Sequence, residues 1–347
     1  MISVADIPYE NRIINLRDGY AMVWPFRNLE KGQGPYELFL DNNAVVRSEW
    51  LRGLKLKVTG GIALNPTLAW VEQWLSNASF RDNAEGRIND FLAPFIAEGF
   101  CFPVGYARAQ ARSLESNERA WKTQWMLVYL YVVLLYRIVK ARKGDSIPAK
   151  LLAELRSQDV PIFSGCIMLC CLGSYLRKNQ KVRLVGDDNS AYSYLNSFIS
   201  LHGSGKGESQ FDENYLRNRV GDLSLWYALG SLLQNGFRPA GESVLITQDK
   251  ALSKFILRCL PGVQISGLPM AFTFDERVFD DEHRDAIIEQ IEAVVPTVSP
   301  TQTRQKQLER MSSLRDYVKR GADQELVEAV DRVWEEWLTP GFNLSFQ

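Results

Sequence analysis

The stretch Tyr36-Glu-Leu-Phe-Leu-Asp-Asn-Asn-Ala-Val-Val46 decides the fold class, because an apolar strand runs directly into an acidic turn. A second stretch, Val244-Leu-Ile-Thr-Gln-Asp249, repeats this order with a β-branched strand. In parallel α/β sheets the carboxyl ends of the strands line the ligand crevice. Asp41 and Asp249 therefore lie where the chemistry of such a fold is expected.

Each of these aspartates also has a simpler interpretation. Aspartate is a favoured helix N-cap, and helices are predicted directly after both, over residues 44–54 and 250–259. Taken alone, either residue is better interpreted as a cap. Two strands that each end in an aspartate favour a functional site.

Outward from the two strands the pattern is mainly helical. Asn65-Pro-Thr67 predicts a helix start, because proline is tolerated in the first helical turn. The sequence predicts helices through residues 80–180, from 218–222 to Gly236 and over 283–338, and short strands at 20–24 and 263–265.

Residues 125–136 are unbroken apolar or aromatic, and Arg137 ends the run. The run is too short for a membrane span, which needs about 20 residues. We expect a buried central helix and no membrane association. The first eighteen residues carry five charges and do not resemble a signal peptide, so a cytoplasmic location is expected.

Composition excludes several classes of protein. A hydrophobic fraction of 46% argues against long disorder, and a net charge of -1 leaves nucleic-acid binding to a local patch. The cluster Cys166, Cys170 and Cys171 lies in an apolar run and is predicted to be buried. Only two histidines, His202 and His283, are present, which excludes a histidine-rich zinc site. Residues 201–214 fail the phosphate-loop template and are expected to connect elements.

Four short motifs resemble those of the PIN nuclease family. Phe39-Leu-Asp-Asn-Asn-Ala-Val-Val46 resembles its opening motif, a strand followed by Asp-x-Asn, and Leu245-Ile-Thr-Gln-Asp249 resembles its closing Thr-x-Asp motif. Gly221-Asp-Leu-Ser-Leu-Trp-Tyr-Ala228 resembles the third motif, in which an aspartate opens a helix. The family's second acid is a glutamate on an early helix. Glu72 is the candidate, and its rivals are Glu85, Asp90 and Glu98.

The resemblance implies an α/β fold, with a PIN-like parallel-sheet core, a large mainly α-helical insertion and a C-terminal helical extension. The expected organisation is an N-terminal segment over 1–35, a discontinuous nuclease core over 36–79 and 210–275, the insertion over 80–209 and the extension over 276–347. The insertion between Glu72 and Asp222 is much longer than family members usually have.

Several carboxylates at strand ends repel one another unless a divalent cation lies among them. Hard oxygen ligands without histidine or cysteine favour Mg²⁺ or Mn²⁺. Such a cation activates water as the nucleophile and stabilises the charge that develops on a phosphate. The predicted catalytic and metal-ligating residues are Asp41, Glu72, Asp222 and Asp249.

Two further groups of residues are predicted to assist. Asn43 and Thr247 would orient an acid, or else form local turns. Basic residues that flank the acids in sequence would contact phosphates, although each is also an ordinary surface charge; they are Arg217, Arg219, Lys250 and Lys254.

The resemblance therefore implies a Mg²⁺-dependent ribonuclease, an endonuclease that acts on RNA, and a regulatory protein is among its expected partners. Because the PIN family includes toxins of toxin–antitoxin pairs, a toxin-like or defence effector is expected by analogy. Two alternatives stay open. One is a nuclease of the same fold that cuts DNA or flaps, and the other is a non-catalytic helical binding or scaffold protein whose acids are caps.

Overall fold

The computed structural model describes residues 12–26, 35–54, 61–140, 148–199, 213–234, 236–263, 271–292 and 304–338. The chain divides into two compact units. Unit 1 comprises residues 1–121 and 221–271, and unit 2 comprises residues 122–220 and 272–347. The residues of the predicted helical insertion, 80–209, are thus shared between the two units.

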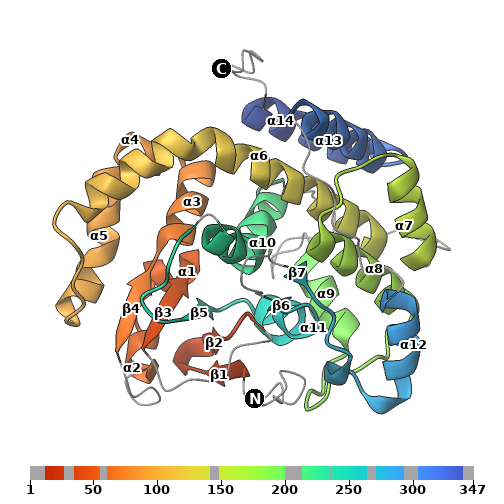
Figure 1. The fold of residues 1–347 in the computed structure, drawn as a ribbon, viewed down its shortest axis with the longest axis horizontal. Coiled ribbons are helices and arrows are strands. Elements are labelled where there is room, and N and C mark those ends of the chain that lie inside the picture. Colours follow the sequence, from red (N-terminus) through yellow and green to blue (C-terminus); the bar gives the residue numbers. More distant parts are fainter. Residues whose placement is uncertain are drawn as a thin grey trace. The chain divides into compact units, whose positions relative to one another are not determined.

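A five-stranded sheet forms the centre of unit 1, in the order β1-β2-β5-β3-β4 (Figure 1). The strands are β1 (Ile13–Asn15), β2 (Ala21–Val23), β3 (Tyr36–Leu40), β4 (Ile62–Asn65) and β5 (Glu242–Thr247). β3 pairs in parallel with both β4 and β5, whereas β2 is antiparallel to β5 and to β1. The α/β class is confirmed, and the sheet is mixed rather than wholly parallel.

The central strands are buried over nearly their whole length, as their apolar runs predict. Leu38 and Phe39 of β3 and Val244 of β5 are each 0% exposed. The one charged residue of β3 is Glu37, whose carboxylate accepts hydrogen bonds from Asn65 Nδ2 and Ala240 N, both at 2.6 Å. Glu37 thereby ties β3 to β4 and to the segment that leads into β5.

Helices follow both β3 and β4 in the sequence. They are α1 (Asn42–Val46), α2 (Trp50–Leu54), α3 (Thr67–Ser76), α4 (Ala78–Asp82) and α5 (Ala84–Ala97). α3 contacts β3 and α1, and α1 contacts β5 and α5 (Figure 1). α3 starts one residue after Pro66, as predicted.

Three predicted elements need correction. The single helix expected over 44–54 is two helices, because Arg47 is extended (φ -124°, ψ 114°) and the Trp50 indole donates to the carbonyl of Ala44 at 2.8 Å. α10 (Glu213–Gln234) begins earlier than residues 218–222. The strand expected at 263–265 is β6 (Gly262–Val263), and the last two predicted residues lie outside the described residues.

The rest of the chain consists of short elements after β5 and longer helices. The helical turn Leu252–Ile256 is a π-helix and leads into α11 (Leu257–Cys259); later come β7 (Ala271–Phe272) and a 3₁₀ turn, Glu276–Val278. The remaining helices are α6 (Tyr106–Lys140), α7 (Pro148–Ser157), α8 (Ser164–Lys178), α9 (Ala191–Ile199), α12 (Asp281–Glu292), α13 (Arg304–Lys319) and α14 (Gln324–Leu338).

In unit 2, α8 contacts α7, α9 and α12. The apolar run of α6 is buried as predicted: Val128, Tyr129 and Leu130 are 0% exposed, and the Trp337 ring meets Tyr129 edge-on. The three clustered cysteines are buried too, and burial raises the pKa of the Cys166 thiol. None of the helices within the described ranges has the length and apolar character to cross a membrane.

Candidate active site

The candidate site lies at the carboxyl ends of β3 and β5. After β3 the chain moves to β4 on one side and later returns to β5 on the other side. The strand order therefore reverses between β3 and β5, and open α/β sheets bind ligands beyond the strand ends at such a point. Asp41 directly follows β3, and Asp249 follows β5 after one intervening residue.

Asp41 connects the ends of these two strands. Its Oδ1 accepts a hydrogen bond from Ala44 N at 2.6 Å, and its Oδ2 accepts one from Gln248 N at 3.1 Å. The residue is 4% exposed, and burial raises its pKa to about 6, although hydrogen bonds from Thr247, Ala44 and Gln248 oppose the rise. A carboxyl group that titrates near neutral pH is one that acid–base chemistry can use.

Asp249 caps the helical turn that follows β5, since its Oδ1 accepts from Leu252 N at 2.7 Å. Its charge contributes to the raised pKa of Asp41, so the two carboxylates are electrostatic neighbours. Thr247 lies between them: its side chain hydrogen-bonds to Asp41, and its Oγ1 accepts from Asp249 N at 3.0 Å. Both aspartates are thus caps, and one threonine links them.

Glu72 contacts the helix that carries Asp222. An ideal Cβ on Gly221 would lie 2.6 Å from the carboxyl carbon of Glu72, so this carboxylate rests against the backbone of α10. Asp222 is the next residue of α10, and its Oδ2 is buried. A Cβ at position 221 would displace the end of the Glu72 side chain from this place.

Side-chain contacts also hold α3 near the end of β3. Gln73, which follows Glu72, donates from Nε2 to Asn42 Oδ1 at 2.6 Å. Carboxylate oxygens suit a hard divalent cation. Within the ranges that the structure describes, however, no three histidine, cysteine or acidic side chains are placed so that they could hold one ion. The four acids lie in unit 1, and a shared metal site remains a prediction.

The rival acids lie at the surface. Asp90 and Glu98 are exposed, and Glu85 forms a surface ion pair with Arg108 at 3.2 Å. Glu72 contacts the helix that carries Asp222, which favours it over these three as the second acid.

Sequence reasoning missed Tyr20, which is 2% exposed. Its hydroxyl donates to the backbone carbonyl of Asn43 at 3.1 Å, and burial together with the charge of Asp41 raises its pKa to about 12. Asn43 therefore uses its carbonyl here, whereas Asn42 makes the side-chain contact with α3. The predicted strand at 20–24 was the available signal, but its pairing beside β5 is not visible in the sequence.

The four predicted phosphate-binding residues fall in different places. Arg217 forms ion pairs with Glu213 and Glu336 at 2.7 and 2.6 Å, and Arg219 lies over the ring of Tyr215 at 4.7 Å. Both arginines belong to unit 2. Lys250 is exposed and Lys254 is partly exposed, and both follow Asp249 in unit 1.

Comparison of the chain with protein-family models, curated proteins and solved structures found no match. Its function is therefore argued from the geometry described above.

Proposed function

We propose that the protein is a divalent-metal-dependent ribonuclease with a PIN-like core, whose active site lies at the carboxyl ends of β3 and β5. One observation carries the proposal. Two adjacent parallel strands, at the point where the strand order reverses, each deliver an aspartate, and Thr247 links the two. This is the place where α/β sheets bind ligands.

In this proposal Asp41, Glu72, Asp222 and Asp249 hold Mg²⁺ or Mn²⁺ through carboxylate oxygens. When bound, such an ion lowers the pKa of water and stabilises negative charge on a phosphoryl group. Thr247 and the backbone N–H groups of Ala44 and Gln248 orient Asp41. Lys250 and Lys254 supply positive charge for the phosphates of the substrate.

The test is cleavage of end-labelled single-stranded RNA and single-stranded DNA by purified protein, with Mg²⁺, Mn²⁺ or EDTA. We expect RNA cleavage that EDTA stops. Asp41→Asn and Asp249→Asn should each lower the rate by roughly two orders of magnitude or more, because each removes a ligand. Asp90→Asn, which changes an exposed aspartate on α5, is the matched control and should cleave like the wild type. A fully active Asp41→Asn variant would refute the proposal, and cleavage of DNA alone would assign the site to a DNA nuclease.

A non-catalytic binding or scaffold protein is the second candidate. It is favoured by the caps, because Asp41 and Asp249 each accept a backbone N–H of the helix that follows. On this reading Asp249→Ala costs about 1 kcal/mol of stability, and neither Mg²⁺ nor Mn²⁺ changes the melting temperature. Cleavage of any nucleic acid that depends on metal and on Asp41 excludes it.

A further inference from the structure

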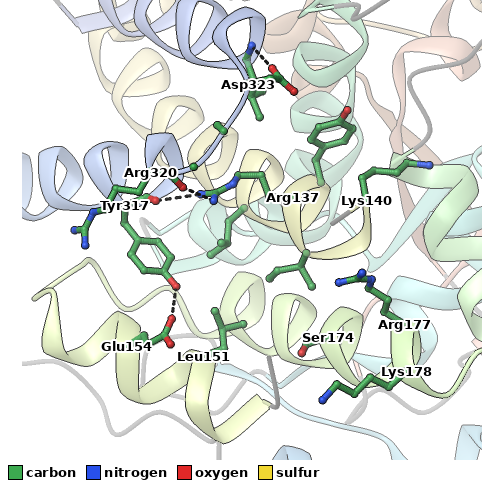
Figure 2. Close-up of a pocket in the computed structure, with 16 residues that line it drawn as sticks. Arg137, Lys140, Leu151, Glu154, Ser174, Arg177, Lys178, Tyr317, Arg320 and Asp323 are labelled. Carbon is green, nitrogen blue, oxygen red and sulfur yellow. Dashed lines mark hydrogen bonds between the residues drawn. The ribbon is translucent and has the colours of Figure 1, made fainter. Parts of the chain in front are cut away.

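Unit 2 contains a cavity of about 680 Å³, and all the residues that line it belong to this unit. The ends of α6, α8 and α13, the start of α14 and one face of α7 enclose it (Figure 2). Its volume lies within the range of small-molecule sites, roughly 300–1,000 Å³. The proposed ribonuclease site uses none of these residues.

Positive charge dominates the lining of the cavity. The basic side chains are Arg137, Lys140, Arg177, Lys178 and Arg320, and the acidic ones are Glu154 and Asp323. Both acids have partners from the protein, as Figure 2 shows: Glu154 accepts from the Tyr317 hydroxyl at 2.9 Å, and Asp323 accepts from Leu326 N at 2.9 Å as the cap of α14. Five basic and two acidic side chains thus line the cavity, which leaves an excess of positive charge.

Two of the basic residues form hydrogen bonds with other parts of the protein. Arg137 donates to the carbonyls of Tyr317 and Val318 at 3.1 and 2.7 Å and also to that of Arg320, so its charge serves the end of α13. Arg320 donates to Gln158 and lies over the Tyr317 ring. These contacts position the wall of the cavity.

Arg177 differs from them. It is partly buried, and the part of the chain that the structure describes offers its guanidinium no ion-pair or hydrogen-bond partner. Figure 2 shows it extending from α8 toward the space that Lys140 also borders. Lys140 donates to Asn196 Oδ1 at 2.9 Å, which leaves two of its three N–H donors for a ligand.

The helix dipole favours basic residues in the last turn of a helix, which is one reason for their presence here. That effect operates equally well when the side chain points into open solvent. It does not account for basic residues from α6 and α8 that line one partly open cavity, where like charges repel each other and partial burial reduces their hydration. Burial indeed lowers the pKa of Lys140. An anion in the cavity removes both costs.

The remaining lining residues suit a ligand with an organic body. Leu134, Ile138 and Leu151 supply apolar surface, and Tyr136 and Tyr317 supply rings. Arginine and lysine donors beside such surface fit a phosphate attached to a planar or apolar group. We propose that this cavity binds a phosphorylated small molecule of nucleotide size, with Arg177 and Lys140 contacting its phosphate.

The experiment is isothermal titration calorimetry of the full-length protein with AMP, ATP, adenosine and inorganic pyrophosphate. We expect AMP or ATP to bind and adenosine to bind at least about 10-fold more weakly, because a charge-assisted contact to phosphate is lost. Arg177→Gln and Lys140→Gln should each weaken nucleotide binding by about 10-fold or more. Arg156→Gln is the matched control, because it removes the same charge from an exposed position on α7 outside the cavity, and it should bind like the wild type.

Three results would overturn the proposal. In the first, adenosine binds as tightly as AMP. In the second, both Arg177→Gln and Lys140→Gln melt like the wild type and bind the nucleotide as tightly as the wild type does. The third is binding of a short 5′-phosphorylated RNA through Arg177 while AMP and ATP fail to bind at millimolar concentration. That outcome would assign the cavity to nucleic acid. None of these results depends on whether the protein cleaves RNA.

Discussion

Asp41 should make the stability of the protein fall as the pH rises from about 4 to about 7. Its pKa is raised from 3.8 in the unfolded chain to about 6 in the fold, chiefly by burial. Between these two values the folded state keeps a proton that the unfolded state has lost. The contribution of Asp41 to the free energy of unfolding is therefore fully present below its pKa in the unfolded chain, and it is lost as the pH rises through its pKa in the folded protein. A pKa difference of about two corresponds to roughly 3 kcal/mol.

Asp41→Asn isolates this effect. Asparagine has one acceptor oxygen, whereas Asp41 accepts from Ala44 N and Gln248 N with different oxygens. The variant should lose one of these hydrogen bonds, at a cost of about 1–3 kcal/mol that does not depend on pH. The difference in unfolding free energy between variant and wild type should therefore shift by about 3 kcal/mol in favour of the variant from about pH 3 to about pH 7.5.

The measurement is urea unfolding of both proteins at several pH values with EDTA present. Titrating groups that do not interact with Asp41 are common to both proteins and cancel in the difference. Asp90→Asn controls for the removal of a surface charge. Parallel stability curves for wild type and Asp41→Asn across this range would show that Asp41 does not have a raised pKa in the fold. Repeating the series with Mg²⁺ adds a test of function, because an ion at Asp41 stabilises its charged form and should shrink the shift.

Two further predictions concern Asp222 and the contact between Glu72 and Gly221. If Asp222 shares a pocket with other carboxylates, Asp222→Asn should melt at or above the wild type without metal. It should also lose most of the rise in melting temperature that Mn²⁺ gives the wild type. Equal responses of wild type, Asp222→Asn and Asp222→Ala to Mn²⁺ would mean that Asp222 is not part of the site. Gly221→Ala should displace the Glu72 carboxylate, because the added Cβ would lie 2.6 Å from the carboxyl carbon; since that carboxylate ends a flexible side chain, the net cost should be at most about 1 kcal/mol. In a Glu72→Ala background the same change should be neutral or stabilise the protein by up to about 1 kcal/mol, since alanine is a better helix former than glycine. Urea unfolding measures both effects. An equal cost in both backgrounds would mean that Glu72 does not contact Gly221.

The sequence was sufficient to predict β3, β5 and the aspartates that follow them. Each strand is an apolar run buried on both faces, and each is followed by a polar turn, so local pattern and tertiary environment agree. β4 was missed because Ile62-Ala-Leu-Asn65 is short and contains only one β-branched residue. The antiparallel pairing of β2 with β5 was also missed, because strand order depends on packing between segments far apart in the chain.

The arrangement of the acids shows the same limit. Residue types and spacing place four carboxylates in a family pattern, but they do not give the distance between a helix and a strand end. The contact of Glu72 with Gly221 joins two helices remote in sequence and depends on the missing side chain of a glycine. Tyr20 depends on the pairing of β2 between β1 and β5, whose register no local pattern specifies.

The capping and metal-binding interpretations of Asp41 are compatible with each other. An ionised carboxylate offers about four lone-pair positions. Among the described residues three donors use them: Ala44 N, Gln248 N and the Thr247 side chain. One position remains, so Asp41 has room to ligate a cation through a single oxygen while it still caps α1. The three donors fix the orientation of the carboxylate in advance, which is how partners of a ligand raise metal affinity. A helix cap at the end of β3 is thus the local structure expected of a metal ligand whose orientation must stay fixed. The cap itself does not distinguish an enzyme from a scaffold protein, whereas metal-dependent cleavage does.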